Sequence, residues 1–272
     1  ENFQMTVQRE KQIPTGDILF TSLVQHPIVP VHTEDGGWGG PVSGMTDRQN
    51  PVRLIEDNKQ NRYQFVRPFG NVFVEVNPLK NLQLKSSFGV DYNMFYARNI
   101  QKTYVSGFLN EPDNKVTNNT SLSGNWIWTN TATYDIIKPR HRFNFLLGQE
   151  QIKFTQEYFS ASREGFISES TDYAYLSAGA TNQLYSGGGQ KWALLSYFGK
   201  INYAFNDRYL ASFTVRRDGS SRFGKNNRYG NFPAASIGWR FSEEQFIKNL
   251  FDKPVNFKLR ASWGQNGNQE IS

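Results

Sequence analysis

Alternation of apolar and polar residues is the dominant pattern of the chain. In residues 81–96 the even positions are nearly all apolar or aromatic, and the odd positions are nearly all polar. A period of two residues is typical of a β-strand with one apolar and one polar face. The alternation predicts about eight strands, over residues 62–76, 81–96, 125–138, 141–154, 192–205, 208–218, 231–241 and 255–264.

The connections between these predicted strands alternate between short and long. The short ones are tight turns, at residues 77–80, 139–140 and 206–207. The long ones are polar loops, over residues 97–124, 155–191 and 219–230. In an antiparallel meander this order places every tight turn at one end of the sheet and every long loop at the other.

Such asymmetry is typical of an outer-membrane β-barrel, which has short periplasmic turns and long extracellular loops. Several predicted strands also reach the roughly 9–11 residues that a tilted strand needs to cross the hydrocarbon. We therefore predict an all-β fold, a segment of an antiparallel up-and-down transmembrane barrel. One turn-side connection differs: Ser242 and Gln245 match a capping box, which predicts a short helix over residues 242–251 at the periplasmic rim.

The composition fits a sheet with two unlike faces. Of the 272 residues, 41 are aromatic (22 Phe, 13 Tyr and 6 Trp), yet the mean hydropathy is −0.62. Alternation reconciles the two values, because averaging over both faces hides an apolar surface. The chain has no cysteine, which excludes disulfides, thiolate metal sites and a cysteine nucleophile. The net charge is +6, but the basic residues are scattered, so nucleic-acid binding is not predicted.

No group of residues predicts an enzyme. His26 and His32 lie in an extended segment without a third metal ligand, and Glu243 and Glu244 are merely adjacent. Residues 187–191 lack the spacing of a phosphate-binding loop. We therefore predict no catalytic residue, cofactor or metal. The chain shows no signal peptide at its start and stops just after a predicted strand, so we expect a segment of a longer polypeptide.

A long ordered motif lies in the last third of the chain. It reads Arg-Arg-Asp-Gly-Ser-Ser-Arg-Phe-Gly at 216–224 and Asn-Phe-Pro-Ala-Ala-Ser-Ile-Gly-Trp-Arg-Phe-Ser-Glu-Glu at 231–244. Asn-Phe-Lys-Leu-Arg-Ala-Ser-Trp-Gly follows at 256–264. These residues resemble the SusC/RagA family of TonB-linked outer-membrane proteins from Bacteroidota.

The resemblance implies a barrel of about 22 strands, plugged by an N-terminal domain. It also implies a SusD-like surface lipoprotein as a lid, and import of glycans or peptides with energy from the TonB complex. On that basis residues 1–61 form an extracellular excursion, and residues 62–272 form part of a barrel wall in contact with outer-membrane lipid. The plug is expected to be missing from this segment.

Three residues are candidates for contact with substrate or lid: Trp38, Arg217 and Arg222. Trp38 lies in a Gly-rich loop at residues 36–40. For Arg217 and Arg222 the favoured interpretation is structural, because they flank a turn at Asp218 and Gly219 and could form ion pairs between loops. Trp126 and Trp128 share a strand face near a loop end, which favours an interfacial aromatic girdle.

The alternative hypothesis is a soluble carbohydrate-binding β-sandwich whose loops bind a glycan. A sandwich covers its apolar face with a second sheet, whereas a membrane wall leaves that face for lipid. The two hypotheses therefore differ in what lies against the apolar side chains.

Overall fold

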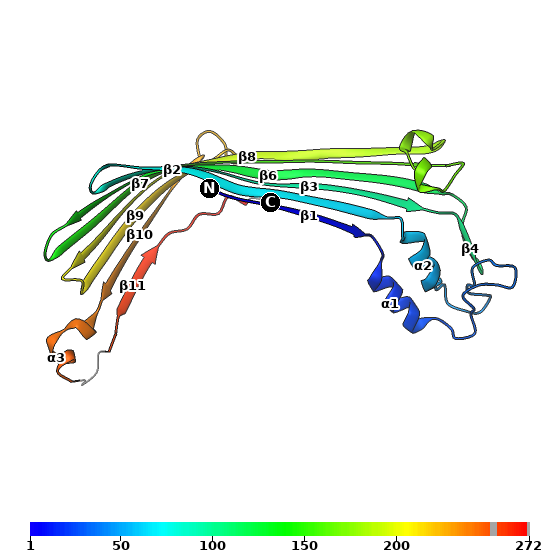
Figure 1. The fold of residues 1–272 in the computed structure, drawn as a ribbon, viewed down its shortest axis with the longest axis horizontal. Helices are drawn as coiled ribbons and strands as arrows, with labels where there is room; N and C mark the ends of the chain where they lie inside the picture. Colours follow the sequence, from blue (N-terminus) through cyan, green and yellow to red (C-terminus); the bar gives the residue numbers. More distant parts are fainter. Residues whose placement is uncertain (251–254, 271–272) are drawn as a thin grey trace.

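The computed structural model describes residues 1–250 and 255–270, and its main feature is one antiparallel sheet of nine strands (Figure 1). The sheet order is β1-β2-β3-β6-β7-β8-β9-β10-β11, so neighbours follow one another along the chain, with the β4–β5 hairpin inserted between β3 and β6. The bounds are β1 (Asn2–Lys11), β2 (Arg62–Leu79), β3 (Leu82–Gln101), β4 (Tyr104–Ser106), β5 (Leu109–Glu111), β6 (Lys115–Ile137), β7 (His141–Glu164), β8 (Thr181–Phe205), β9 (Tyr209–Ser220), β10 (Tyr229–Trp239) and β11 (Leu259–Gly264). The predicted antiparallel meander is confirmed.

The two ends of the sheet differ, as the connections predict. The tight turns β2–β3, β6–β7 and β8–β9 lie at one end, near helix α3 (Gln245–Lys248), and we call this the turn end (Figure 1). Helices α1 (Thr15–Val24) and α2 (Pro51–Asn58) and strand β4 lie at the opposite end, the loop end. At the β8–β9 turn Asn206 and Asp207 have φ of 50° and 55°, a left-handed conformation that Asn and Asp tolerate better than most residues.

Several strands are longer than their apolar alternation predicts. β7 and β8 have 24 and 25 residues, so the predicted loop 155–191 is reduced to residues 165–180. Each predicted strand ends where the alternation stops. Backbone pairing continues beyond that point because ladder hydrogen bonds require no apolar face, and polar side chains suit a sheet with solvent on both sides.

Residues 1–61 are predicted to form an extracellular excursion, and none of the predicted strands includes residues 2–11. Instead β1 pairs with β2 from Asn2↔Asn71 to Lys11↔Arg62, and the sheet begins there. The signal was present, because Phe3, Met5 and Val7 alternate with polar residues.

Cross-strand register assigns the side chains to two faces, since residues directly opposite each other point the same way. One face, here called the band face, carries an apolar band across the sheet: Val72, Val74, Phe88, Val90, Trp126, Trp128, Phe145, Leu147, Ile201, Phe213, Val215, Pro233, Ala235, Ile237, Ala261 and Trp263. Phe213 and Ile237 are 50% and 66% exposed, and no second sheet covers the band within the part of the chain that the structure describes. The band therefore counts against the sandwich alternative.

The opposite face, here called the polar face, carries charged side chains in pairs. Arg67 donates two hydrogen bonds to Asp91 at 2.7 and 2.8 Å, and Lys85 lies 3.8 Å from Glu75. Each pair joins β2 to β3. The sheet thus has one apolar and one hydrated face, which are the requirements of lipid and of an aqueous lumen.

The loop end is covered on both faces. On the band face Ile100 and Val116 pack with Phe166 and Ala174 of the β7–β8 loop, which contains the 3₁₀ helices η1 (Thr171–Tyr173) and η2 (Leu176–Ala178). On the other face α2 contacts β3, where Ala97 is 1% exposed. This end therefore has a small packed core of its own.

The predicted rim helix is present but shorter than expected. A 3₁₀ turn, η3 (Phe241–Glu243), precedes α3, and Ser242 lies inside it rather than capping the helix. Ser242 is buried in that turn, and Glu244 stands at the N-terminus of α3 without a side-chain cap. Residue 251, the predicted end, lies outside the described residues. No helix in the described part of the chain is long and apolar enough to cross a bilayer.

Candidate functional site

A polar pocket of about 860 Å³ opens at the loop end, between the sheet and α2. Its walls come from the ends of β1, β2, β3 and β6, from α2 and from Tyr104 of β4. Tyr63, Asn99, Gln101 and Thr117, which line it, share the polar face by register. The pocket therefore sits on the hydrated side of the wall, at the end that bears the long loops.

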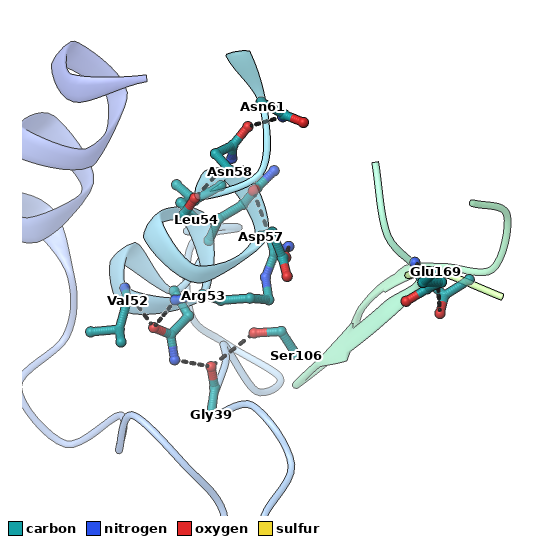
Figure 2. A network of polar contacts seen from close by, with 12 residues as sticks. Gly39, Val52, Arg53, Leu54, Asp57, Asn58, Asn61, Ser106 and Glu169 are labelled. Carbon is teal, nitrogen blue, oxygen red and sulfur yellow. Dashed lines mark hydrogen bonds and ion pairs between the residues drawn. The ribbon is translucent and has the colours of Figure 1, made fainter. Parts of the chain in front are cut away.

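Asn50 fixes the start of α2 and the loop before it. The side chain is 2% exposed, and its Oδ1 accepts hydrogen bonds from the backbone N–H groups of Val52 and Arg53 at 3.0 and 3.2 Å. Its Nδ2 donates to the carbonyl oxygens of Val31 and Gly39 at 2.8 and 3.0 Å. Figure 2 shows Gly39 beside the start of α2, where its carbonyl oxygen also accepts a hydrogen bond from Ser106. Because Asn is a strong N-cap and Pro51 suits the first helical turn, the sequence specifies this helix start locally.

Arg53 joins α2 to the β4–β5 hairpin. It is 3% exposed and donates to Asp57 and to Gln49, both at 2.7 Å. Its guanidinium carbon lies 3.5 Å from the ring centroid of Tyr104. A buried cation needs charge compensation and hydrogen-bond acceptors, and here the two terminal nitrogens of the guanidinium have a carboxylate and an amide oxygen, beside an aromatic face.

The pocket also contains polar groups that are available to a ligand. No hydrogen bond within the described residues engages the side chains of Asn99, Gln101 or Thr117. Tyr63 Oη donates to Glu10 at 2.5 Å. This bond, with a second from Gln8, lowers the pKa of the Glu10 carboxyl, which lies beyond the apolar residues of β1. Free amide and hydroxyl groups beside an ionised carboxylate can bind ligand hydroxyl or amide groups.

Further along the polar face, a row of side chains connects four strands. Register aligns Thr129, Glu150, Ser196 and Asp218 across β6, β7, β8 and β9. Arg216 donates to Asp218 at 2.7 Å and to Glu150 and Ser196 at 2.8 Å. Two carboxylates face one guanidinium, so the row carries a net negative charge towards the hydrated side.

The three predicted contact residues do not come together. Trp38 is half-buried, stacks on His32 with ring centroids 4.5 Å apart, and directly precedes Gly39, whose carbonyl oxygen accepts a hydrogen bond from Asn50. Arg222 pairs with Glu270 at 2.7 Å and lies 5.3 Å from the Trp192 ring centroid. Arg217 is exposed on the band face, opposite to Arg216.

The sequence pattern does not predict the pocket beside α2 or the contacts of Asn50 and Arg53 that hold this helix. Its signals were local: a helix cap at Asn50-Pro51, and Arg53 with Asp57 four residues later on the same helical face. The contact with Tyr104 could not be anticipated, because it joins residues 51 positions apart in the chain through the insertion of β4.

Comparison with known proteins places this geometry in context. The chain is 32% identical over 315 residues to the TonB-dependent receptor SusC of Bacteroides thetaiotaomicron, covering 97% of this chain and 28% of SusC. It is 28% identical over 265 residues to TonB-dependent receptor P3 of Formosa agariphila, covering 94% of this chain and 25% of that receptor. The chain therefore spans about a quarter of the length of these relatives. No family model matches it.

Solved structures give the same picture. The RagAB peptide transporter superimposes with a TM-score of 0.74 at 27% identity, covering 87% of this chain and 26% of the transporter chain. A RagAB peptide importer in the open-open state superimposes with a TM-score of 0.72, covering 85% of this chain and 25% of that chain.

Proposed function

We propose that this chain, a homologue of the SusC-type TonB-dependent receptors, forms part of the barrel wall of an outer-membrane nutrient importer. The observation that carries the proposal is the division of one antiparallel sheet into an uncovered apolar band and a charged, hydrogen-bonded polar face. Lipid would contact the band, and the polar face would line the lumen.

The wall contributes position and surface chemistry, and the proposal assigns it no covalent step. Cargo entering from the loop end would meet the α2 pocket first and then the negatively charged row around Arg216. Energy from the TonB complex would act through another part of the polypeptide. A SusD-like lipoprotein would cover the loop end, where Trp38 and Arg222 are the candidate contacts.

The proposed cargo is a glycan or a peptide. The free amide and hydroxyl groups of Asn99, Gln101 and Thr117 can bond to either, because both present hydroxyl or amide donors and acceptors. One structural neighbour, RagAB, is described as a peptide transporter, which supports the peptide alternative.

Filling the pocket tests this function. Deletion of the whole gene should abolish growth on one class of glycan or peptide as the sole carbon source. In the full-length protein, Asn99→Trp should then slow uptake of that cargo by about tenfold, because the indole would occupy the pocket. Met94→Trp is the matched control, since Met94 lies on the band face of the same strand.

Both variants must reach the outer membrane in wild-type amounts, which immunoblotting of membrane fractions measures. Wild-type uptake by Asn99→Trp would contradict the assigned role of the pocket. Normal growth of the deletion strain on every glycan and peptide would contradict the importer itself.

A further inference from the structure

Four polar residues form a continuous row on the band face, on four neighbouring strands. Register aligns Gln149 with Tyr197, Tyr197 with Arg217, and Arg217 with Asn231. We call these four residues the border row. Adjacent strands lie about 4.8 Å apart, so the side chains are close neighbours along the sheet surface.

On β7, β9 and β10 the border row lies at the loop-end limit of the apolar band, whereas on β3 and β6 the band continues towards the loop end to Phe88, Val90, Trp126 and Trp128. The next row towards the turn end consists of residues without polar side chains: Leu147, Gly199, Val215 and Pro233. Leu147 and Val215 are exposed, at 68% and 43%. If lipid covers the band, the border row stands on β7, β9 and β10 at the level where hydrocarbon gives way to headgroups.

The border row offers hydrogen-bond donors and no carboxylate. Gln149 Oε1 accepts a hydrogen bond from Asn130 at 3.1 Å, which leaves the amide N–H groups of Gln149 free to donate. Tyr197 is 52% exposed, and Asn231 is exposed. The Arg217 guanidinium lies 5.0 Å from the ring centroid of Tyr229, which supports it from the loop side.

Arg217 differs from Arg216, its neighbour in the sequence, in the number of carboxylates that it pairs with. Arg216, on the polar face, pairs with two carboxylates. Within the described residues no carboxylate pairs with Arg217. Lys153, on the band face nearer the loop end, likewise has no acidic partner there, whereas Lys191 pairs with Glu157 at 2.8 Å. The border row therefore has excess positive charge.

We propose that the border row binds the phosphate of a phosphorylated lipid in the outer leaflet. The Arg217 guanidinium has a phenol and an amide on the two neighbouring strands and lies beside an apolar surface, which matches a phosphate group joined to acyl chains. Arg217 supplies the charge, and Gln149, Tyr197 and Asn231 supply further hydrogen bonds. This proposal rests on the proposed function, because it requires lipid against the band face.

Lipid retention by the full-length protein tests the border row. The protein would be reconstituted in phosphatidylcholine nanodiscs containing lipid A, and bound lipid A would be counted by native mass spectrometry after release. Arg217→Gln should weaken lipid A binding about fivefold, as expected for loss of one cation near a membrane surface. Lys200→Gln is the matched control and should bind as the wild type does, because Lys200 lies on the polar face opposite Thr214.

A second arm replaces lipid A by its dephosphorylated form, which should bind the wild type as weakly as lipid A binds Arg217→Gln. Equal lipid A binding by the wild type and Arg217→Gln would overturn the proposal, as would equal losses in Arg217→Gln and Lys200→Gln. If the wild-type protein failed to insert into nanodiscs at all, the proposed function would fail rather than the border row alone.

Discussion

Arg216 and Arg217 are adjacent in sequence and have opposite surroundings. In a strand, successive side chains point to opposite faces. Arg216 therefore reaches Glu150 and Asp218 on the polar face, whereas Arg217 stands above Val215 at the edge of the apolar band. The same residue type stabilises the wall in one case and is available to a ligand in the other.

The alternation could have separated these two arginines from the sequence alone. The period of two around Phe213 and Val215 continues to Arg217, so it predicts the face of each arginine. It could not predict the partners, because Glu150 is 66 residues from Arg216 and meets it only through the pairing of β7, β8 and β9. The buried position of Arg53 was hidden for the same reason.

Arg53→Leu should release α2 from the β4–β5 hairpin in the full-length protein. The substitution leaves the Asp57 carboxylate, which is only 15% exposed, without its cation. Removing one partner of a buried ion pair costs about 3 kcal/mol, so the open population should rise roughly a hundredfold. Limited proteolysis within residues 12–61 measures this opening.

Lys59→Leu is the control for that experiment. The Lys59–Glu56 pair is 49% and 44% exposed, and exposed pairs contribute about 0–1 kcal/mol. Cleavage of Lys59→Leu should therefore remain near the wild-type rate. Equal cleavage of all three proteins would show that Arg53 does not hold the helix.

At the scale of whole elements, the sequence predicted the strands well and their ends poorly. The positions of the tight turns followed from residues such as Asn206 and Asp207, whose left-handed conformations suit a hairpin. The outer parts of β7 and β8 lack an apolar face, so no periodic signal marked them. The rim helix was predicted from Ser242, but its attachment comes from Glu244.

Glu244 connects the rim to the strands. Its carboxylate accepts hydrogen bonds from Tyr209 at 2.7 Å, from Trp239 at 3.1 Å and from Arg208 at 3.1 Å. The bonds from Tyr209 and Trp239, with help from Arg208, lower the pKa of Glu244 below its ordinary value of 4.5. The ionised carboxylate thus binds α3 and η3 to the ends of β9 and β10.

This attachment should depend on pH. A lowered folded-state pKa means that the stabilisation is fully present above about pH 4.5 and is lost as the pH falls through the folded-state value. Hydrogen exchange of residues 241–250, corrected for intrinsic rates, should therefore accelerate as the pH falls below 4.5. Glu244→Gln should remove most of that dependence, and an unchanged pH profile in this variant would contradict the role of the carboxylate.

At the scale of the molecule, the sheet is a wall with two unlike faces. Within the described residues β1 and β11 pair on one side only, and edges of this kind are removed when a barrel closes. The relatives are about four times as long as this chain, and we propose that the rest of such a polypeptide completes the wall. The alternation predicted this two-faced sheet, but it carries no information on how the two edges would be closed.

Spin labels on two adjacent residues of β9 test the central claim most directly. Phe213 lies in the apolar band and Ser212 on the polar face, and the chain contains no cysteine of its own. In the full-length protein, reconstituted in lipid and freed of other cysteines, Phe213→Cys and Ser212→Cys would each carry a nitroxide, with Ala211→Cys as a second band-face site.

Frequent collisions of the nitroxide with oxygen indicate that the side chain faces lipid. Frequent collisions with a water-soluble nickel chelate indicate that it faces an aqueous lumen. We expect oxygen to dominate at positions 213 and 211 and the nickel chelate to dominate at 212. Equal accessibility at all three positions, or nickel access at 213 and 211, would contradict a wall with lipid on one face and water on the other.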